Sequence, residues 1–561
     1  MLRFLFLCVL VAQISGFGMR PLGMSRTLRV QSLKMVRLLS PENQGKEIFL
    51  YNTAARTKQA FEPIDQTSKK SVSFYSCGPT VYDFAHIGNF RAFLTYDVLK
   101  RWLTYCGYNV DHVCNLTDVD DKIIVKMTAE GKSLKQVTEF YSEAFMNDLD
   151  ALNVIRANKY PKATEHINDI IAMISRLIET GHAYENNGSV YFRVSAFQDY
   201  GVMANLPEYE EMKEGYGGSG PNNKKGVEEK ESARDFALWK AFSEADGEVV
   251  WDSPFGMGRP GWHIECSAMC NCFLGPTIDI HAGGVDLVFP HHQNEVAQSE
   301  AFSGKTFSNY WVHNGFVNID NEKMSKSLKN FKTLREVAKN SFDTRAFRYM
   351  IVTAQYRSQL NFTPDTLSAA ANSLKRIDKV VAKLEQLSSS NSSSSHSPEG
   401  LDDAALIAEA ASCVSRFEQG MLDDINAPRA AAALFGLVGA AEKAIKAAAK
   451  LQDGGCLGSE PALVALKAVR RMDSVFGVLY SVPDAYFEST GAGVQANTVD
   501  KSVPLSFETV PEEVLGLAND RVKAKEAKDW TKADQLRAEI AEKGFAIKDV
   551  KGDAKYEIYA A

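Results

Sequence analysis

Two short segments carry residue types that could bind and stabilise a nucleoside triphosphate. Residues 85–89 place His86, Gly88 and Asn89 in one turn, and residues 323–327 contain two lysines and two serines. Ammonium and imidazole groups can stabilise charge that develops on reacting phosphates. Either segment alone also fits an ordinary turn or a solvated charge cluster. The two together, in this order, favour an ATP-handling site.

The elements around residues 85–89 predict a βαβ unit. Residues 73–77 have strand composition, residues 89–105 carry apolar side chains at helical spacing, and residues 109–115 alternate like a second strand. Such a unit implies an α/β fold with a parallel sheet. The turn then lies at a helix N-terminus, where free N–H groups favour phosphate. Gly88 leaves room for a nucleotide because it has no side chain.

The lysine-containing segment follows a predicted strand and a tight turn. Residues 315–317 are followed by residues 320–322 and then by the lysines. That order fits a lid that closes over a triphosphate. We therefore expect Lys326 to stabilise charge on the phosphates and Lys323 to support it.

Four single residues could hold a metal ion. They lie at the ends of predicted elements that should meet at the carboxyl edge of the sheet: Cys77, Cys266, His291 and Glu295. Because His291 and Glu295 are four residues apart, they would share one face of a helix starting near Pro290. Two thiolates, an imidazole and a carboxylate suit zinc.

Neighbouring residues compete for the same roles. His292 is three residues from Glu295, so spacing alone does not exclude it. Cys270 and Cys272 compete with Cys266 in the same way. A single buried cysteine is most often a small core residue. Spacing therefore leaves the ligand set open.

Length and composition are those of a globular protein with several domains. A chain of 561 residues predicts about three or four domains, and 45% apolar with 24% charged residues is typical of soluble proteins. A net charge of −7 excludes nucleic-acid binding through bulk charge but allows a local basic groove. Nine cysteines indicate reduced thiols rather than an even disulfide framework. Because no apolar run is long enough for a transmembrane helix, we expect no membrane partner.

Residues 1–41 predict a presequence. An apolar run at residues 4–11 follows Arg3 as in a signal peptide, and further basic residues then precede the first acidic residue, Glu42. A signal followed by a transit-like segment resembles the bipartite presequences of algae with complex plastids. We expect a plastid location. The alternatives are a plain signal peptide and, from internal methionines, a mitochondrial or cytosolic product.

The remaining chain divides into a large domain, a helical region and a small tail. Within residues 48–342, residues from about 160 to 250 form an insertion. Residues 343–487 show alanine-rich helical periodicity, interrupted by a serine-rich loop at 388–397. The charged tail, residues 508–561, predicts two helices and a hairpin.

Four longer strings resemble the cysteinyl-tRNA synthetase family, and the two ATP-handling segments resemble the signatures of class I aminoacyl-tRNA synthetases. The strings occupy residues 76–83, 115–123, 258–269 and 289–295, and the resemblance extends from about residue 48 to the C-terminus. It implies a Rossmann-like, doubly wound parallel-sheet catalytic domain with an insertion. An α-helical bundle and a small C-terminal anticodon-binding domain are expected to follow.

The resemblance assigns roles by position. It places one zinc ion per subunit on Cys77, Cys266, His291 and Glu295. It gives catalytic roles to His86, Asn89, Lys323 and Lys326. The expected ATP contacts are His86, Gly88, Asn89, Asp286 and Lys326, and the expected amino-acid contacts are Gly78, Thr117 and Trp262. Trp262 could equally be a core residue, the usual fate of tryptophan.

The chain departs from the family pattern in places. Asn89 replaces the usual histidine, which weakens an ionic role there, and Lys329 replaces glycine after the lysine-containing segment. In the tail, Trp530 and Asp534 lie four residues apart and match positions that contact anticodon bases by stacking and hydrogen bonding. Lys525 replaces the usual arginine, so a bidentate base contact is not expected there.

The resemblance implies that L-cysteine is activated with ATP and Mg²⁺ to cysteinyl-adenylate and then transferred to the 3′ end of tRNA(Cys). A zinc ion favours a coordinating thiolate over a hydroxyl, so it would select cysteine over serine. Two alternatives share these motifs. One is a ligase that joins cysteine to a small amine, and the other is a catalytically silent protein that binds tRNA. We expect a monomer rather than a dimer.

Overall fold

The computed structural model describes residues 46–65, 67, 70–206, 230–324, 330–389, 397–451, 455–489, 510–527, 529–543, 545–549 and 556–560. Contacts divide the chain into two units, Met1–Val482 and Pro483–Ala561. Among the described helices, none is both long and apolar enough to cross a membrane.

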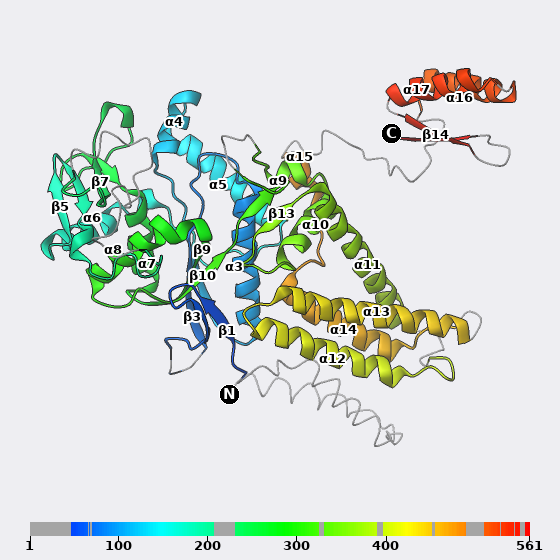
Figure 1. The fold of residues 1–561 in the computed structure, drawn as a ribbon, viewed down its shortest axis with the longest axis horizontal. Helices are drawn as coiled ribbons and strands as arrows, with labels where there is room; N and C mark the ends of the chain where they lie inside the picture. Colours follow the sequence, from blue (N-terminus) through cyan, green and yellow to red (C-terminus); the bar gives the residue numbers. More distant parts are fainter. Residues whose placement is uncertain are drawn as a thin grey trace, which may run out of the picture. The chain divides into compact units, whose positions relative to one another are not determined.

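A four-stranded parallel sheet lies at the centre of the first unit (Figure 1). Its buried apolar side chains, such as Val72, Phe74 and Ile280, explain why these segments form interior strands. Because the strands are parallel, their carboxyl ends meet at one edge. In spatial order the strands are β10 (Ser308–Asn314), β9 (Ile278–Gly284), β3 (Ser71–Ser76) and β4 (Asn109–Cys114).

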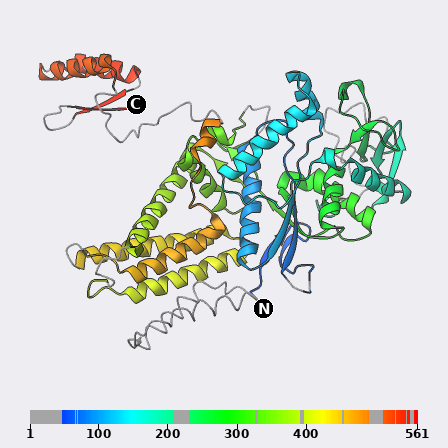
Figure 2. The ribbon, with the colours of Figure 1, turned by 180° about the vertical axis from the view of Figure 1, so that it is seen from behind.

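Helix α3 (Ile87–Tyr105) connects β3 to β4 and buries Phe90, Leu94 and Leu99. It lies on one side of the sheet, and helix α7 (Trp262–Leu274) lies on the other, as Figures 1 and 2 show from opposite directions. The predicted strand–helix–strand unit is therefore confirmed, with α3 beginning two residues before the predicted start.

A second sheet, antiparallel, lies between β4 and β9 in the sequence. It packs with helix α6 (Ile167–Glu179) around a separate apolar core that includes Ile174, Phe192 and Trp239. Part of the predicted polar loop at 213–232 lies outside the described residues. The strands are β5 (Ala183–Asn186), β6 (Ser189–Phe192), β7 (Phe236–Ala241) and β8 (Gly258–Pro260).

Helices follow the sheets, as the alanine-rich periodicity predicts. Arg348 is buried and ties this region to the parallel sheet's helix, since its guanidinium donates to the carbonyl oxygens of Phe476 and Leu152 and pairs with Asp97 on α3. The helices are α10 (Ser341–Val352), α11 (Pro364–Ser389), α12 (Asp403–Leu422), α13 (Ala427–Leu451) and α14 (Ser459–Phe476).

The second unit has its own small core, formed by residues such as Val514, Ala518, Ile540 and Ile558. The predicted two helices and hairpin of the tail are present and pack around this core. The elements are α16 (Glu512–Glu526), α17 (Trp530–Glu542), β14 (Phe545–Asp549) and β15 (Tyr556–Ala560), the last two pairing antiparallel.

Candidate functional site

The metal-ligand candidates gather at the carboxyl edge of the parallel sheet. Cys77 directly follows β3, and its backbone N–H donates to the carbonyl oxygen of Ala282 on β9 at 3.3 Å. Helix α7 supplies Cys266 from the other side. The sheet edge therefore brings together side chains that are almost 200 residues apart in sequence.

The other two candidates come from the entry to helix α8 (Gln293–Ser303). The predicted helix start near Pro290 is confirmed. A π-helical turn, Val288–His292, leads into α8, and within it Phe289 alone has a non-helical, extended backbone (φ −136°, ψ 132°). His291 therefore reaches Glu295, with 3.1 Å between Nε2 and Oε1.

The four predicted ligands form one buried cluster. The potential ligand atoms of Cys77, Cys266, His291 and Glu295 all lie within 4.8 Å of one another. The Cys77 thiol donates to Oε1 of Glu295 at 3.4 Å. The structure therefore brings together the set that the sequence proposed.

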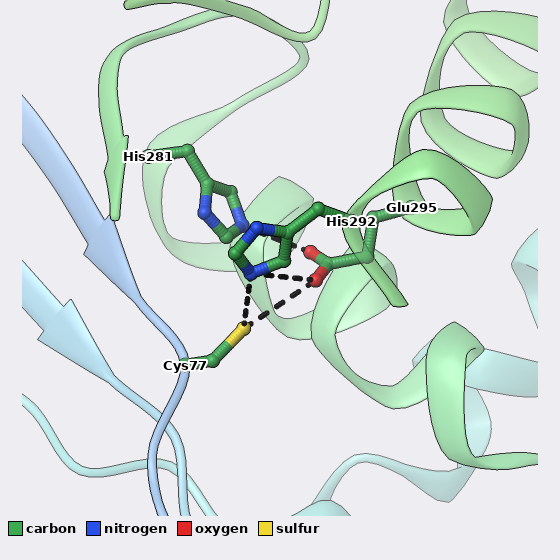
Figure 3. Close-up of side chains that lie close together, drawn as sticks. All are labelled: Cys77, His281, His292 and Glu295. Carbon is green, nitrogen blue, oxygen red and sulfur yellow. Dashed lines mark hydrogen bonds and ion pairs between the residues drawn. The ribbon is translucent and has the colours of Figure 1, made fainter. Parts of the chain in front are cut away.

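A second set of four shares two of these residues (Figure 3). Cys77 Sγ lies 3.3 Å from Nε2 of His292, and His281 Nε2 lies 2.9 Å from Oε2 of Glu295. The competing histidine, His292, thus also faces the cluster. Neither Cys270 nor Cys272 belongs to either set within the described part of the chain.

Three histidines of this pocket were not predicted: His263, His281 and His313. His263 Nδ1 lies 2.9 Å from Nδ1 of His291, and His313 Nε2 lies 2.8 Å from Nδ1 of His292. His291 and His292 are thus held through Nδ1, which leaves Nε2 directed at the cluster, as is common for metal-binding histidines. The sequence signal was weak, since His281 lies in the middle of β9 and only His313 lies next to the carboxyl end of its strand, β10.

Electrostatics in the cluster favour the anionic forms of Glu295 and Cys266 but not that of Cys77. Burial opposes ionisation of Glu295, but the charges of His281 and His291 outweigh it and lower the carboxyl pKa to about 2. The hydrogen bond with Cys77 is the main cause that lowers the pKa of Cys266 to about 6, whereas burial raises the pKa of Cys77. Burial lowers the pKa of His292, so its imidazole is neutral and can act as a ligand.

These donors fit a divalent ion of the zinc type. Cysteine, histidine and carboxylate side chains are zinc's usual ligands, and all three types are buried here together. Nδ1 of His281 is buried and has no hydrogen-bond partner among the described residues. A buried polar group without a hydrogen-bond partner costs folding free energy unless a bound ion or water molecule interacts with it.

The predicted amino-acid contacts lie beside the cluster. A Cβ added at Gly78 would overlap the carbonyl oxygen of Asn115, so only glycine fits there. The Asn115 side chain binds both neighbours, accepting from Gly78 N at 2.9 Å and donating to Thr117 Oγ1 at 3.1 Å. Trp262 is 38% exposed, and its ring centroid lies 4.4 Å from that of His291. Trp262 is therefore not a core residue; it borders the cluster on the solvent side.

The histidine turn begins helix α3. His86 is the N-cap residue: Asn89 N donates to His86 Nδ1 at 3.2 Å, and His86 N donates to Asn89 Oδ1 at 3.1 Å. This reciprocal pair is a capping box, which stabilises a helix N-terminus. Asn89 therefore has a structural task that a short amide side chain performs well.

The second ATP-handling segment approaches the same turn. A short antiparallel pair, β11 (Val317–Ile319) and β12 (Glu322–Lys323), leads to Met324, whose Cε would lie 3.5 Å from a Cβ added at Gly88. The predicted tight turn is confirmed, whereas the strand predicted at residues 315–317 instead spans Val317–Ile319. Lys326 and Lys329 lie outside the described residues, as does the side chain of Lys323.

Two further predicted contacts can be located. Asp286 is exposed in the turn after β9, at the same carboxyl edge. In the second unit, Trp530 begins α17 and is 60% exposed, and Asp534 is exposed one turn later. Exposure of an aromatic ring and a carboxylate leaves both available to a partner.

Two regions of the chain match known protein families. Residues 63–372, more than half of the chain, match the family described as tRNA synthetases class I (C) catalytic domain. Residues 416–480, within α12 to α14 and the loop after them, match the DALR domain.

The chain is similar in sequence to cysteine–tRNA ligases and in fold to solved synthetase structures. The chain is 39% identical to a cysteine–tRNA ligase of Chlamydia trachomatis serovar A over 518 residues, covering 91% of this chain and 99% of the relative. It is 40% identical over 510 residues to a cysteine–tRNA ligase of Caldicellulosiruptor saccharolyticus, with the same coverage. A Mycobacterium tuberculosis methionyl-tRNA synthetase bound by methionyl-adenylate shares the fold, with a TM-score of 0.53, 15% identity, and coverage of 74% of this chain and 93% of that one. The chain therefore belongs to the cysteine–tRNA ligase family of class I aminoacyl-tRNA synthetases.

Proposed function

We propose that this protein joins L-cysteine to tRNA(Cys) in an ATP-dependent, two-step reaction. The observation that carries the proposal is the buried thiol–imidazole–carboxylate cluster beside a helix N-terminus that suits phosphate. Both lie at the carboxyl edge of one parallel sheet, where ligands of such folds bind. The family to which the chain belongs supports the same activity.

We propose Cys77, Cys266, His291 and Glu295 as the ligands of a zinc ion. Their cluster borders Trp262, which is 38% exposed, so it lies on the side that a substrate can reach. The competing pair, His281 and His292, packs instead against Trp311, which is only 2% exposed. When bound, zinc supplies a Lewis acid that favours a thiolate over a hydroxyl and so selects cysteine over serine.

In the first step, the carboxylate of cysteine attacks the α-phosphorus of ATP, and pyrophosphate leaves. Gly78 and Thr117 would border the amino acid, and their positions beside each other are fixed by hydrogen bonds to the Asn115 side chain. The α3 N-terminus, with its Gly88, favours the phosphates, and Mg²⁺ accompanies ATP. His86, Lys323 and Lys326 stabilise the charge that develops on the leaving pyrophosphate. Asp286 would accept hydrogen bonds from the ribose hydroxyls.

In the second step, a ribose hydroxyl at the 3′ end of tRNA attacks the carbonyl carbon of cysteinyl-adenylate, and AMP leaves. The DALR region supports a tRNA acceptor rather than a small amine. Trp530 and Asp534 of the second unit would contact anticodon bases by stacking and hydrogen bonding. We also propose that the protein acts as a monomer, which light scattering of the full chain would test.

Cysteine-dependent exchange between ATP and pyrophosphate tests the first step, and charging of added tRNA(Cys) tests the second. We expect exchange with cysteine and none with serine. No exchange by zinc-replete enzyme would contradict the proposal as a whole. Exchange without tRNA charging would instead favour a small amine acceptor.

We further propose that residues 1–41, which lie outside the described residues, target the protein to a plastid. The signal-like run followed by basic residues supports this location. A fusion of residues 1–41 to a fluorescent protein, expressed in an alga with complex plastids, should accumulate in the plastid. Accumulation in mitochondria, in the cytosol or outside the cell would exclude it.

A further inference from the structure

A second group of metal-ligand types lies on the protein surface where α6 meets α7. The potential ligand atoms of His166, Asp169 and Cys272 all lie within 4.8 Å of one another. His166 Nδ1 is 2.8 Å from Asp169 Oδ2, and Cys272 is exposed. None of these three residues has a part in the chemistry proposed above.

This group is separate from the buried cluster. Cys272 lies six residues beyond Cys266 on α7, which is a rise of about 9 Å and a rotation of about 240° around the helix axis. The two thiols therefore point to different faces. This geometry explains why Cys272, a candidate by sequence, does not join the buried cluster.

We propose that His166, Asp169 and Cys272 bind a second zinc ion that clips the start of α6 to the end of α7. A thiolate, an imidazole and a carboxylate are all zinc ligands, and three protein ligands leave a fourth position for water. His166 and Asp169 are three residues apart at the start of α6, so both side chains lie on one face and can chelate one ion.

The geometry requires only small adjustments. Ligand atoms around one tetrahedral zinc ion lie about 3.3–3.8 Å apart, so the His166–Asp169 pair must open by roughly 0.5 Å. Asp169 and Cys272 are exposed and can move freely. His166 is held more firmly, because its ring contacts that of Phe273 with centroids 5.1 Å apart. The ammonium group of Lys159 lies over the same Phe273 ring, 4.6 Å from its centroid, and its positive charge would weaken the affinity for zinc.

Measuring zinc per full-length chain, after equilibration with buffered micromolar zinc and removal of free metal, tests the proposal. The wild type should bind one equivalent more than Cys272→Ser and one more than Asp169→Asn. Cys456→Ser, which removes another incompletely buried thiol far along the sequence, should bind as much as the wild type. Both test residues are exposed, so their variants should fold.

Cobalt provides a second measurement. Titration of the metal-free protein with Co²⁺ should add a second thiolate-to-cobalt absorption step in the wild type that Cys272→Ser lacks. Equal metal content in the wild type, Cys272→Ser and Asp169→Asn would overturn the proposal. The comparison is between variants, so it stays valid even if the buried cluster binds no metal.

Discussion

The candidate metal cluster (Cys77, Cys266, His291 and Glu295) and the histidine turn (residues 85–89) lie at the same sheet edge but are built in different ways. In the cluster, Cys266, His291 and Glu295 are almost completely buried, and neighbouring side chains hold each of them. At the turn, His86 and Asn89 are only half-buried; they hydrogen-bond to each other, and the His86 ring contacts that of Phe331 with centroids 4.8 Å apart. Under the proposed function, selection of cysteine would depend on a preorganised interior, whereas activation would depend on a helix N-terminus and the lysine-containing segment.

Because of this difference, mutations in the two regions should have different effects. The protein interior around a buried cluster has a low effective dielectric. Removing one donor therefore leaves the charges of the remaining donors without a compensating partner. A half-exposed turn is close to solvent, so a mutation there should reduce the rate of ATP–pyrophosphate exchange without disrupting the buried cluster.

Replacing a thiol in the cluster should remove both metal and selectivity. In Cys266→Ser we expect loss of the buried zinc and a fall in the cysteine-over-serine ratio from on the order of 10⁴ toward unity. Metal analysis and exchange assays with each amino acid provide the measurement. Cys270→Ser, the same change at a buried position on the same helix, should retain both properties. Retention of zinc and selectivity by Cys266→Ser would refute the ligand set.

Removing a lysine from the ATP-handling segment should impair the rate alone. We expect Lys326→Ala to reduce the exchange rate by about 10²–10³-fold, because one charge-stabilising donor is lost. Zinc content and the KM for cysteine should stay near the wild-type values. Lys305→Ala, which removes an equal charge from an exposed position, serves as the control. Loss of zinc in Lys326→Ala would break the separation between the two regions.

A change between the two regions should affect binding of the amino acid. Gly78→Ala would force its new Cβ against the Asn115 carbonyl and shift the backbone beside Cys77. We expect kcat/KM for cysteine to fall by about 10²-fold, since a displacement near 1 Å is enough for such a loss. The matched variant Gly516→Ala adds a Cβ where nothing lies within 4 Å and should have no effect. Normal kinetics in Gly78→Ala would show that this close approach does not position the substrate.

The sequence was most informative where local rules decide the outcome. Apolar periodicity located α3 to within two residues of its start, and composition identified the tail's helices and hairpin. The carboxyl-edge rule for parallel strands correctly suggested that Cys77 would meet residues from far downstream. These features depend on nearby residues or on general topology, so one sequence was enough.

The sequence alone could not show which histidine side chains face the cluster. His291 and His292 both direct Nε2 toward the cluster although both lie on helical backbone, so their spacing from Glu295 could not choose between them. His281 and His313 stand alone in their strands, and only the assembled sheet shows their contacts. Tertiary packing decides these positions.

The smallest predicted effect concerns the departure from the family pattern at Asn89. Its side chain completes the capping box with His86, so Asn89→Ala should cost about 1 kcal/mol of stability and lower Tm by a few degrees. Asn89→Gln keeps an acceptor at the same helix position and should restore most of that stability. We expect the exchange rate to change less than tenfold in both, because the amide acts on the helix end rather than on the phosphates. A loss of exchange rate as large as that of Lys326→Ala, with unchanged Tm, would instead indicate that Asn89 contacts ATP directly. The turn would then be a preorganised binding site, like the buried cluster.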